Sequence, residues 1–144
     1  MWVIFALSAS LFWGLTYVLD EKIYEKVSVI TSLAITSFFA FIVLFIVSYF
    51  TGNLKTDVQQ IITNKGLFIL VIAGTVTLII AELFIGFSIS SKNATLAGLI
   101  EISYPIFIAI TAYVLYKENQ LNLSTIIGGV LVFLGVGIIY FYNR

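Results

Sequence analysis

The chain has 144 residues, of which 61% are apolar and 10% are charged, and its mean hydropathy is +1.14. A water-soluble domain is nearer to half apolar and about a quarter charged, so most of this surface must meet lipid. Seven basic residues balance seven acidic ones, which leaves no positive field to attract nucleic acid as a partner. Cys and His are absent, so the side chains behind most metal and hydrolytic sites are missing. We therefore expect a membrane protein without metal or cofactor that is not an enzyme.

Five long stretches carry few charged residues or none, at about residues 2–19, 27–50, 66–90, 94–116 and 123–142. A helix of about 20 mostly apolar residues is needed to cross the hydrocarbon core of a bilayer, with a range of roughly 17–25. Each stretch has this length. The sequence therefore predicts an all-α membrane protein with five transmembrane helices in a single domain over residues 1–144.

One connection between the predicted helices, Thr51–Lys65, is much longer than the others. Within it, Asp57–Thr63 mixes apolar and polar residues. This composition predicts one or two helical turns that lie at the membrane surface, with Thr56 as the capping residue.

Five membrane crossings place the two ends of the chain on opposite sides of the bilayer. Loops on the cytoplasmic side normally carry the excess of Lys and Arg, but here the two sides are almost equal. Three positive side chains belong to the side of the N-terminus and four to the other side: Lys55, Lys65 and Lys117 against Lys22, Lys26, Lys92 and Arg144. Two interpretations stay open. Either Lys22 and Lys26 set a weak bias toward one orientation, or the chain inserts in both orientations and pairs as an antiparallel dimer.

Two acidic residues, Glu82 and Glu101, lie inside predicted membrane helices. A charged side chain at the bilayer centre costs about 2.5–3.5 kcal/mol on insertion scales, so such residues usually face protein or a watery cavity. Glu82 precedes Ser91 by nine residues and Glu101 follows Lys92 by nine. At 1.5 Å per residue, both are expected about 14 Å from the turn, and therefore at one depth.

Two carboxylates at one depth would resist ionising together. Small residues share the helix faces of Glu82 and Glu101, which favours close packing of the two helices. This pattern predicts a site that binds protons or a cationic substrate. The alternative is a pair of protonated acids that hydrogen-bond to neighbouring hydroxyl groups.

Three further residues are expected to shape this site. Pro105 lies four residues after Glu101 and cannot donate a hydrogen bond to its carbonyl. The freed carbonyl would form part of a cradle for a cation or substrate, although an ordinary proline kink would leave the same pattern. Trp13 and Tyr104 are aromatic, and aromatic rings attract cations. The predicted substrate- or proton-binding residues are therefore Glu82, Glu101, Tyr104, Pro105 and Trp13.

The last predicted helix carries a group of glycines. Gly128 and Gly135 are seven residues apart and share one helix face, and Gly129 is adjacent. Small residues let membrane helices approach closely. The pattern predicts that Gly128, Gly129 and Gly135 form a packing surface, either between two chains or within one.

The stretch Asn93–Tyr140 resembles the EamA-like family of the drug/metabolite transporter superfamily. The likeness rests on small residues early in the fourth helix, a proline-centred element, a Glu at the helix end, a glycine-containing last helix and an early Trp-Gly pair. In this sequence these are Ala94 and Ala97, Tyr104-Pro105-Ile106-Phe107, Glu118, Ile127-Gly128-Gly129 with Leu134-Gly135-Val136, and Phe12-Trp13-Gly14.

The resemblance also has implications for assembly. Typical members resemble two five-helix repeats in one chain, whereas this chain has one. It therefore implies one half of an inverted-repeat transporter fold, completed by an antiparallel homodimer. The chain is more distantly similar to the small multidrug-resistance branch, which uses a membrane-embedded Glu. No Glu here aligns clearly with that residue, so its role is not transferred.

Together these features predict a multi-pass transporter of the plasma (inner) membrane that exports or exchanges small polar or cationic metabolites or drugs. Its expected partners are the small-molecule substrate, the lipid bilayer and a second copy of the chain. The predicted mechanism is alternating access in the homodimer, with proton coupling as an option. An alternative is a non-transporting membrane subunit that partners another membrane protein, in which both acids form interhelical hydrogen bonds. A membrane enzyme ranks last, because no carboxylate–metal motif replaces the missing His and Cys.

Overall fold

The computed structural model describes residues 1–119 and 122–143, so Arg144 and part of the connection Lys117–Asn122 lie outside it. The described chain is helical, with elements α1 (Trp2–Tyr24), α2 (Val29–Phe50), α3 (Leu54–Thr63), α4 (Lys65–Ser91), α5 (Ala94–Glu101), α6 (Tyr104–Tyr116) and α7 (Leu123–Tyr142). Five segments of this described part are long and apolar enough to cross a membrane, and the fourth of them consists of α5 and α6 together. The predicted class, an all-α membrane protein with five transmembrane segments, is confirmed.

Polar side chains in the connections determine where most of these helices begin. Ser28, Asn64, Asn93 and Asn122 each accept a hydrogen bond from the backbone N–H three residues further on. The first N–H groups of a helix have no partner within it, so a side-chain oxygen at this position stabilises the helix start.

The first helix is longer than the sequence predicts. It continues through the charged residues 20–22 to Tyr24, where a helix end at residue 19 was expected. The charge-free stretch ends at residue 19, just before the first charged residue, and therefore predicts an early helix end. Glu and Lys are good helix formers, however, and Lys22 also forms an ion pair with Glu25 at 2.6 Å. As a result, Glu21 belongs to a helix face and not to a loop.

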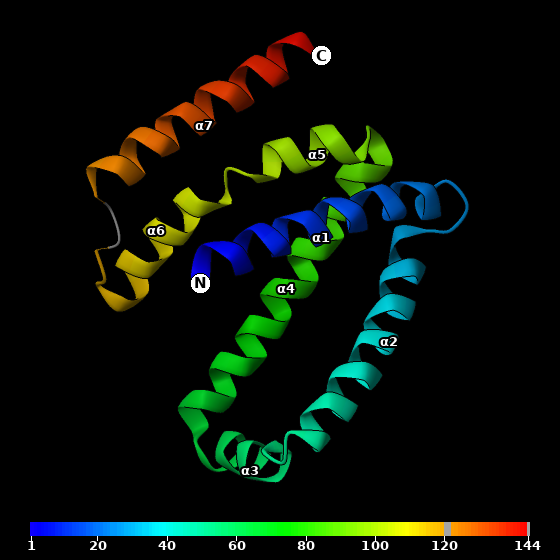
Figure 1. The fold of residues 1–144 in the computed structure, drawn as a ribbon, viewed down its shortest axis with the longest axis vertical. Coiled ribbons are helices and arrows are strands. Elements are labelled where there is room, and N and C mark those ends of the chain that lie inside the picture. Colours follow the sequence, from blue (N-terminus) through cyan, green and yellow to red (C-terminus); the bar gives the residue numbers. More distant parts are fainter. Residues whose placement is uncertain (120–121, 144) are drawn as a thin grey trace.

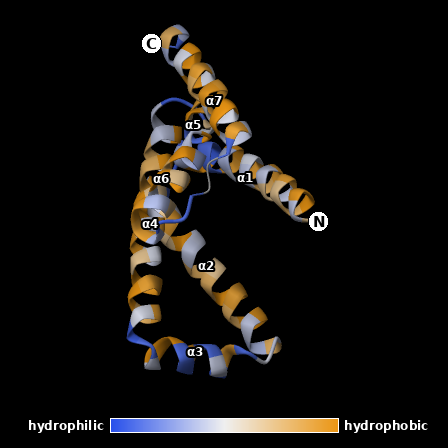
Figure 2. Ribbon diagram, turned by 90° about the vertical axis from the view of Figure 1, so that its left-hand side faces the viewer, coloured by the Kyte–Doolittle hydropathy of each residue, from blue (hydrophilic) through white to orange (hydrophobic). Residues whose placement is uncertain are grey.

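The prediction that Thr56 caps the surface helix is wrong. Helix α3 begins at Leu54, Asn53 occupies the capping position, and Thr56 lies inside the first turn. Leu54 belongs to the apolar face of the helix, so including it extends that face by one turn. Figure 2 shows α3 as a partly hydrophilic helix that joins the ends of two apolar helices, α2 and α4.

The expected span over residues 94–116 is interrupted. Helix α5 ends at Glu101, residues Ile102 and Ser103 form a turn, and α6 begins at Tyr104. Pro105 lies in the first turn of α6. A proline is tolerated there because the N–H that it lacks would have no helical partner. The proline therefore accompanies a break between two helices and not only a kink in one.

The helices pack around one end of the molecule and diverge elsewhere. Helix α1 contacts α4 and α5, and α7 contacts α5, whereas α2 and α4 diverge toward α3 (Figure 1). The buried cluster consists of Ile89, Ala94 and Ala97, near the turn between α4 and α5. Large apolar side chains on every transmembrane helix are exposed, as expected where lipid is the solvent. The best-packed part of the fold thus lies where α1, α4 and α5 meet.

Candidate functional site

A cavity of about 650 Å³ lies between α1, α4 and α5, and it includes the start of α6. Four of the five predicted site residues line it, namely Glu82, Glu101, Trp13 and Tyr104. Pro105 is exposed and is not among the lining residues. Residues from four helices, far apart in the sequence, thus meet at one cavity.

Helices α1 and α5 run antiparallel along this cavity, and three contacts follow their length. The Glu21 carboxylate accepts a hydrogen bond of 2.6 Å from the backbone N–H of Ala94, at the start of α5. One turn back along α1, the Tyr17 ring lies so close to Gly98 that a methyl group there would be 3.3 Å from Tyr17 Cδ2. The Tyr17 hydroxyl then donates a hydrogen bond to the Glu101 carboxylate. This set of contacts fixes Glu101 relative to α1.

The start of α5 is held by two side chains at once. Besides the bond from Ala94 to Glu21, the side chain of Asn93 accepts a hydrogen bond of 2.8 Å from the backbone N–H of Leu96. A helix N-terminus carries partial positive charge, and a carboxylate there is stabilising. Glu21 therefore anchors α5, and with it Glu101, to the end of α1.

Glu82 approaches the cavity from α4. Its side chain is partly buried, and it interacts electrostatically with Asp20 of α1 and with Glu101. Among the residues that the structure describes, no Lys forms an ion pair with either glutamate of the cavity, and the ion pair that is present joins Lys22 to Glu25. Carboxylates that share a cavity without a cation repel each other. A proton or a positively charged ligand would relieve that repulsion.

The aromatic residues form one wall of the cavity. The Trp13 and Tyr17 rings have their centroids 5.8 Å apart at an interplanar angle of 57°. Tyr104 lies at the first position of α6, directly after the break between α5 and α6. Pro105 thus affects the site indirectly, because it lies in the first turn of the helix that begins with Tyr104.

The glycines of α7 divide into two groups. A methyl group on Gly129 would lie 3.5 Å from Ile106 Cγ1, so this glycine packs against α6 within the chain. A methyl group on Gly128 or on Gly135 would meet no described atom within 4 Å. The face that these two glycines share is therefore open in the described chain.

Sequence reasoning missed Tyr17, which lines the cavity, and Glu21, which anchors the start of α5. Tyr17 follows Ser10 and Gly14 on one face of α1, so a signal for it was present. Glu21 had no such signal, because the predicted first helix ended before it. In the described part of the chain, no group of three or more acidic side chains is placed to hold a metal ion.

Comparison with known proteins identifies the family. No curated protein and no solved structure matches the chain. The EamA-like transporter family matches it over residues 1–141, which is almost the whole sequence. The chain is therefore a member of the EamA-like transporter family, within the drug/metabolite transporter superfamily.

Proposed function

We propose that this protein transports small polar or cationic metabolites across the plasma (inner) membrane, as an exporter or exchanger, and binds them in the cavity between α1, α4 and α5. The family consists of membrane transporters and not of enzymes, and five segments of the described chain are of membrane-spanning length. The observation that carries the proposal is the meeting of Glu82 and Glu101 with three aromatic residues in one cavity. Ionisable residues at membrane depth commonly mark substrate and proton pathways.

Proton coupling is the second part of the proposal. Glu82 and Glu101 have no cationic partner among the described residues, so a proton and a cationic substrate would compete for the same carboxylates. Such competition couples movement of the substrate in one direction to movement of the proton in the opposite direction. Trp13 and Tyr104 would hold the substrate by contacts between its charge and their rings.

The third part is an antiparallel homodimer with alternating access. A chain with five spans can supply both halves of an inverted repeat if two copies insert in opposite orientations. Two features support this: the nearly equal positive charge on the two sides of the membrane, and the open face of Gly128 and Gly135 on α7. Small residues on an open helix face suit close contact with a second copy.

Topology reporters fused to each terminus test this assembly. Each terminus is fused in turn to a reporter that is active only inside the cell and to one that is active only outside. Both reporters are expected to show activity at each terminus, at roughly equal levels. A variant with two extra Lys residues in one connection should shift insertion toward a single orientation, because positive charge favours the cytoplasmic side. Insertion of the unmodified chain in one orientation alone would exclude the antiparallel dimer.

Tyr17→Phe tests the contact that orients Glu101. Phe keeps the ring against Gly98 and removes the hydroxyl that bonds Glu101. A hydrogen bond contributes about 0.5–1.5 kcal/mol net, so the apparent KM for transport should rise about 2- to 10-fold. The control is Tyr113→Phe, since Tyr113 is exposed on α6 and does not line the cavity. An unchanged KM for Tyr17→Phe would show that this hydroxyl does not position a substrate-binding group.

Transport itself is measured with purified protein in liposomes that contain a pH-sensitive dye. A panel of small amines, amino acids and other polar metabolites is added outside, and the proposal predicts proton flux that depends on at least one of them. A non-transporting subunit, with its glutamates serving as interhelical hydrogen bonds, would give no such flux. The measurement thus separates the two functions considered for the sequence.

A further inference from the structure

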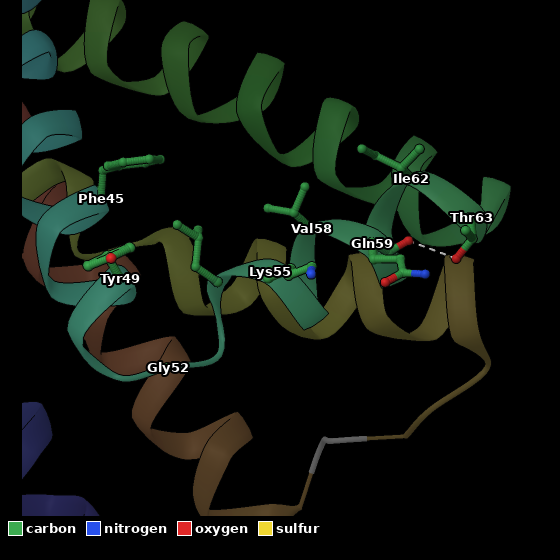
Figure 3. A pocket seen from close by; sticks show the side chains of 9 residues that line it. Phe45, Tyr49, Gly52, Lys55, Val58, Gln59, Ile62 and Thr63 are labelled. Atoms are coloured by element: carbon green, nitrogen blue, oxygen red, sulfur yellow. Dashed lines mark hydrogen bonds between the residues drawn. The ribbon is translucent and has the colours of Figure 1, made fainter.

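A second cavity lies where α2 meets α3, away from the glutamates. It measures about 700 Å³ and is lined by residues from the last two turns of α2, the connection after it and one side of α3. Its walls are mainly apolar, with Phe45 on α2 facing Val58 and Ile62 on α3 (Figure 3). Lys55 and Gln59 also line it, from the neighbouring face of α3.

The position of this cavity in the membrane follows from the connectivity. Helices α2 and α4 both have membrane-spanning length, and α3 joins the end of one to the start of the other. Helix α3 therefore lies at the membrane surface. Phe45 is five residues before the end of α2, which places it about 7.5 Å deeper along the helix at 1.5 Å per residue. The cavity thus runs from the polar membrane surface into the adjacent part of the hydrocarbon core.

Among the polar residues that line the cavity, Lys55 carries a positive charge. Lys55 forms no ion pair with any residue that the structure describes. Asp57, the acidic residue of α3, does not line the cavity. A ligand that fits must therefore combine an anionic head with an apolar tail. In the bilayer, an anionic phospholipid has this chemistry, whereas a zwitterionic lipid would bring its own cation toward Lys55.

We propose that this cavity binds an anionic phospholipid. Its phosphate would lie at Lys55, and the part of an acyl chain next to the headgroup would lie between Phe45, Val58 and Ile62. Juxtamembrane Lys and Arg residues attract anionic lipids. The Gln59 amide can add a hydrogen bond to the headgroup, because it lies one helical turn from Lys55. The bound lipid would hold α3 against the membrane and stabilise the connection between α2 and α4.

Native mass spectrometry of the full-length protein tests this proposal. The detergent-solubilised protein is titrated with phosphatidylglycerol or with phosphatidylcholine of the same acyl chains, and wild type should prefer phosphatidylglycerol. Lys55→Gln should weaken phosphatidylglycerol binding about fivefold, as expected for one basic residue near an anionic surface. Lys55→Arg should retain it. The matched control is Lys26→Gln, which removes a positive charge near the opposite end of α2 and should leave binding unchanged.

Two further arms separate a lipid site from a site for a free anion and from a folding defect. Glycerol phosphate, which has the headgroup charge without the acyl chains, should not displace the lipid. Val58→Asn should weaken lipid binding while the helical circular dichroism signal stays at the wild-type level. The proposal fails if the two lipids bind equally, if glycerol phosphate displaces phosphatidylglycerol, or if Lys26→Gln acts as strongly as Lys55→Gln. Because binding and not transport is measured, the result is independent of the proposed function.

Discussion

Replacement of Glu101 by Gln is expected to lower substrate transport about 10- to 100-fold. Glu101 lines the cavity between α1, α4 and α5, and the Tyr17 hydroxyl holds its carboxylate in place. The hydrogen bond that a cationic substrate would donate to the charged carboxylate contributes about 1.5–3 kcal/mol, which corresponds to this range of rates. The amide of Gln has nearly the same shape, but it lacks the negative charge and cannot bind and release a proton as a carboxylate does. The loss is measured as the initial rate of substrate uptake into liposomes at equal protein content.

The control for this substitution is Asp57→Asn, which also removes one carboxylate. Asp57 lies on α3, outside the cavity of Glu101, so transport should remain near the wild-type rate. If Glu101→Gln transports as fast as Asp57→Asn, Glu101 does not bind the substrate or the proton. A loss of the same size in both variants would indicate a general effect of charge on folding or insertion.

Gly86→Ala is expected to cause the largest loss of stability among the glycine substitutions. A methyl group on Gly86 would lie 2.6 Å from Val29 Cγ1 and 3.2 Å from the Tyr24 hydroxyl oxygen. Val29 is buried at the start of α2, and its branched side chain has few rotamers with which to withdraw. Overpacking of this kind costs about 1–3 kcal/mol. The free energy of unfolding, measured by titration with a denaturing detergent, should fall by this amount.

Gly74→Ala provides the comparison in the same helix. A methyl group there would meet no atom within 4 Å, and alanine is a better helix former than glycine. This variant should therefore be as stable as the wild type or slightly more so. Equal stability of the two variants would mean that α4 does not approach α1 and α2 as closely as the structure has it.

The sequence predicted the fold class well because a membrane imposes a simple rule. Each span must carry about 20 apolar residues, and the charges that interrupt them are easy to see. The boundaries were less predictable where polar residues remain helical. At residues 20–24 of α1, helix-forming charged residues extend the span, and at Leu54 an apolar residue begins α3 before the expected cap. Neither feature changes the hydropathy pattern enough to be recognised.

Part of the candidate site could be recognised from the sequence. Glu82 and Glu101 were recognisable because an acid inside an apolar helix requires an explanation, and both line one cavity in the structure. Tyr17 and Glu21 were not among the predicted site residues, because their roles arise from the pairing of α1 with α5. That pairing joins residues more than 70 positions apart. Spacing within α1 aligns Tyr17 with Ser10 and Gly14, but it does not tell which residues of α5 lie opposite.

Glu82 and Glu101 together are proposed to form the substrate and proton site. The most direct test of this proposal is proton flux out of liposomes, driven by substrate added outside and measured for the wild type, for the Glu82→Gln/Glu101→Gln double variant and for Asp57→Asn. We predict flux for the wild type and for Asp57→Asn, and none above protein-free liposomes for the double variant. Flux through the double variant at the wild-type rate would contradict the account, as would the absence of any flux in the wild type.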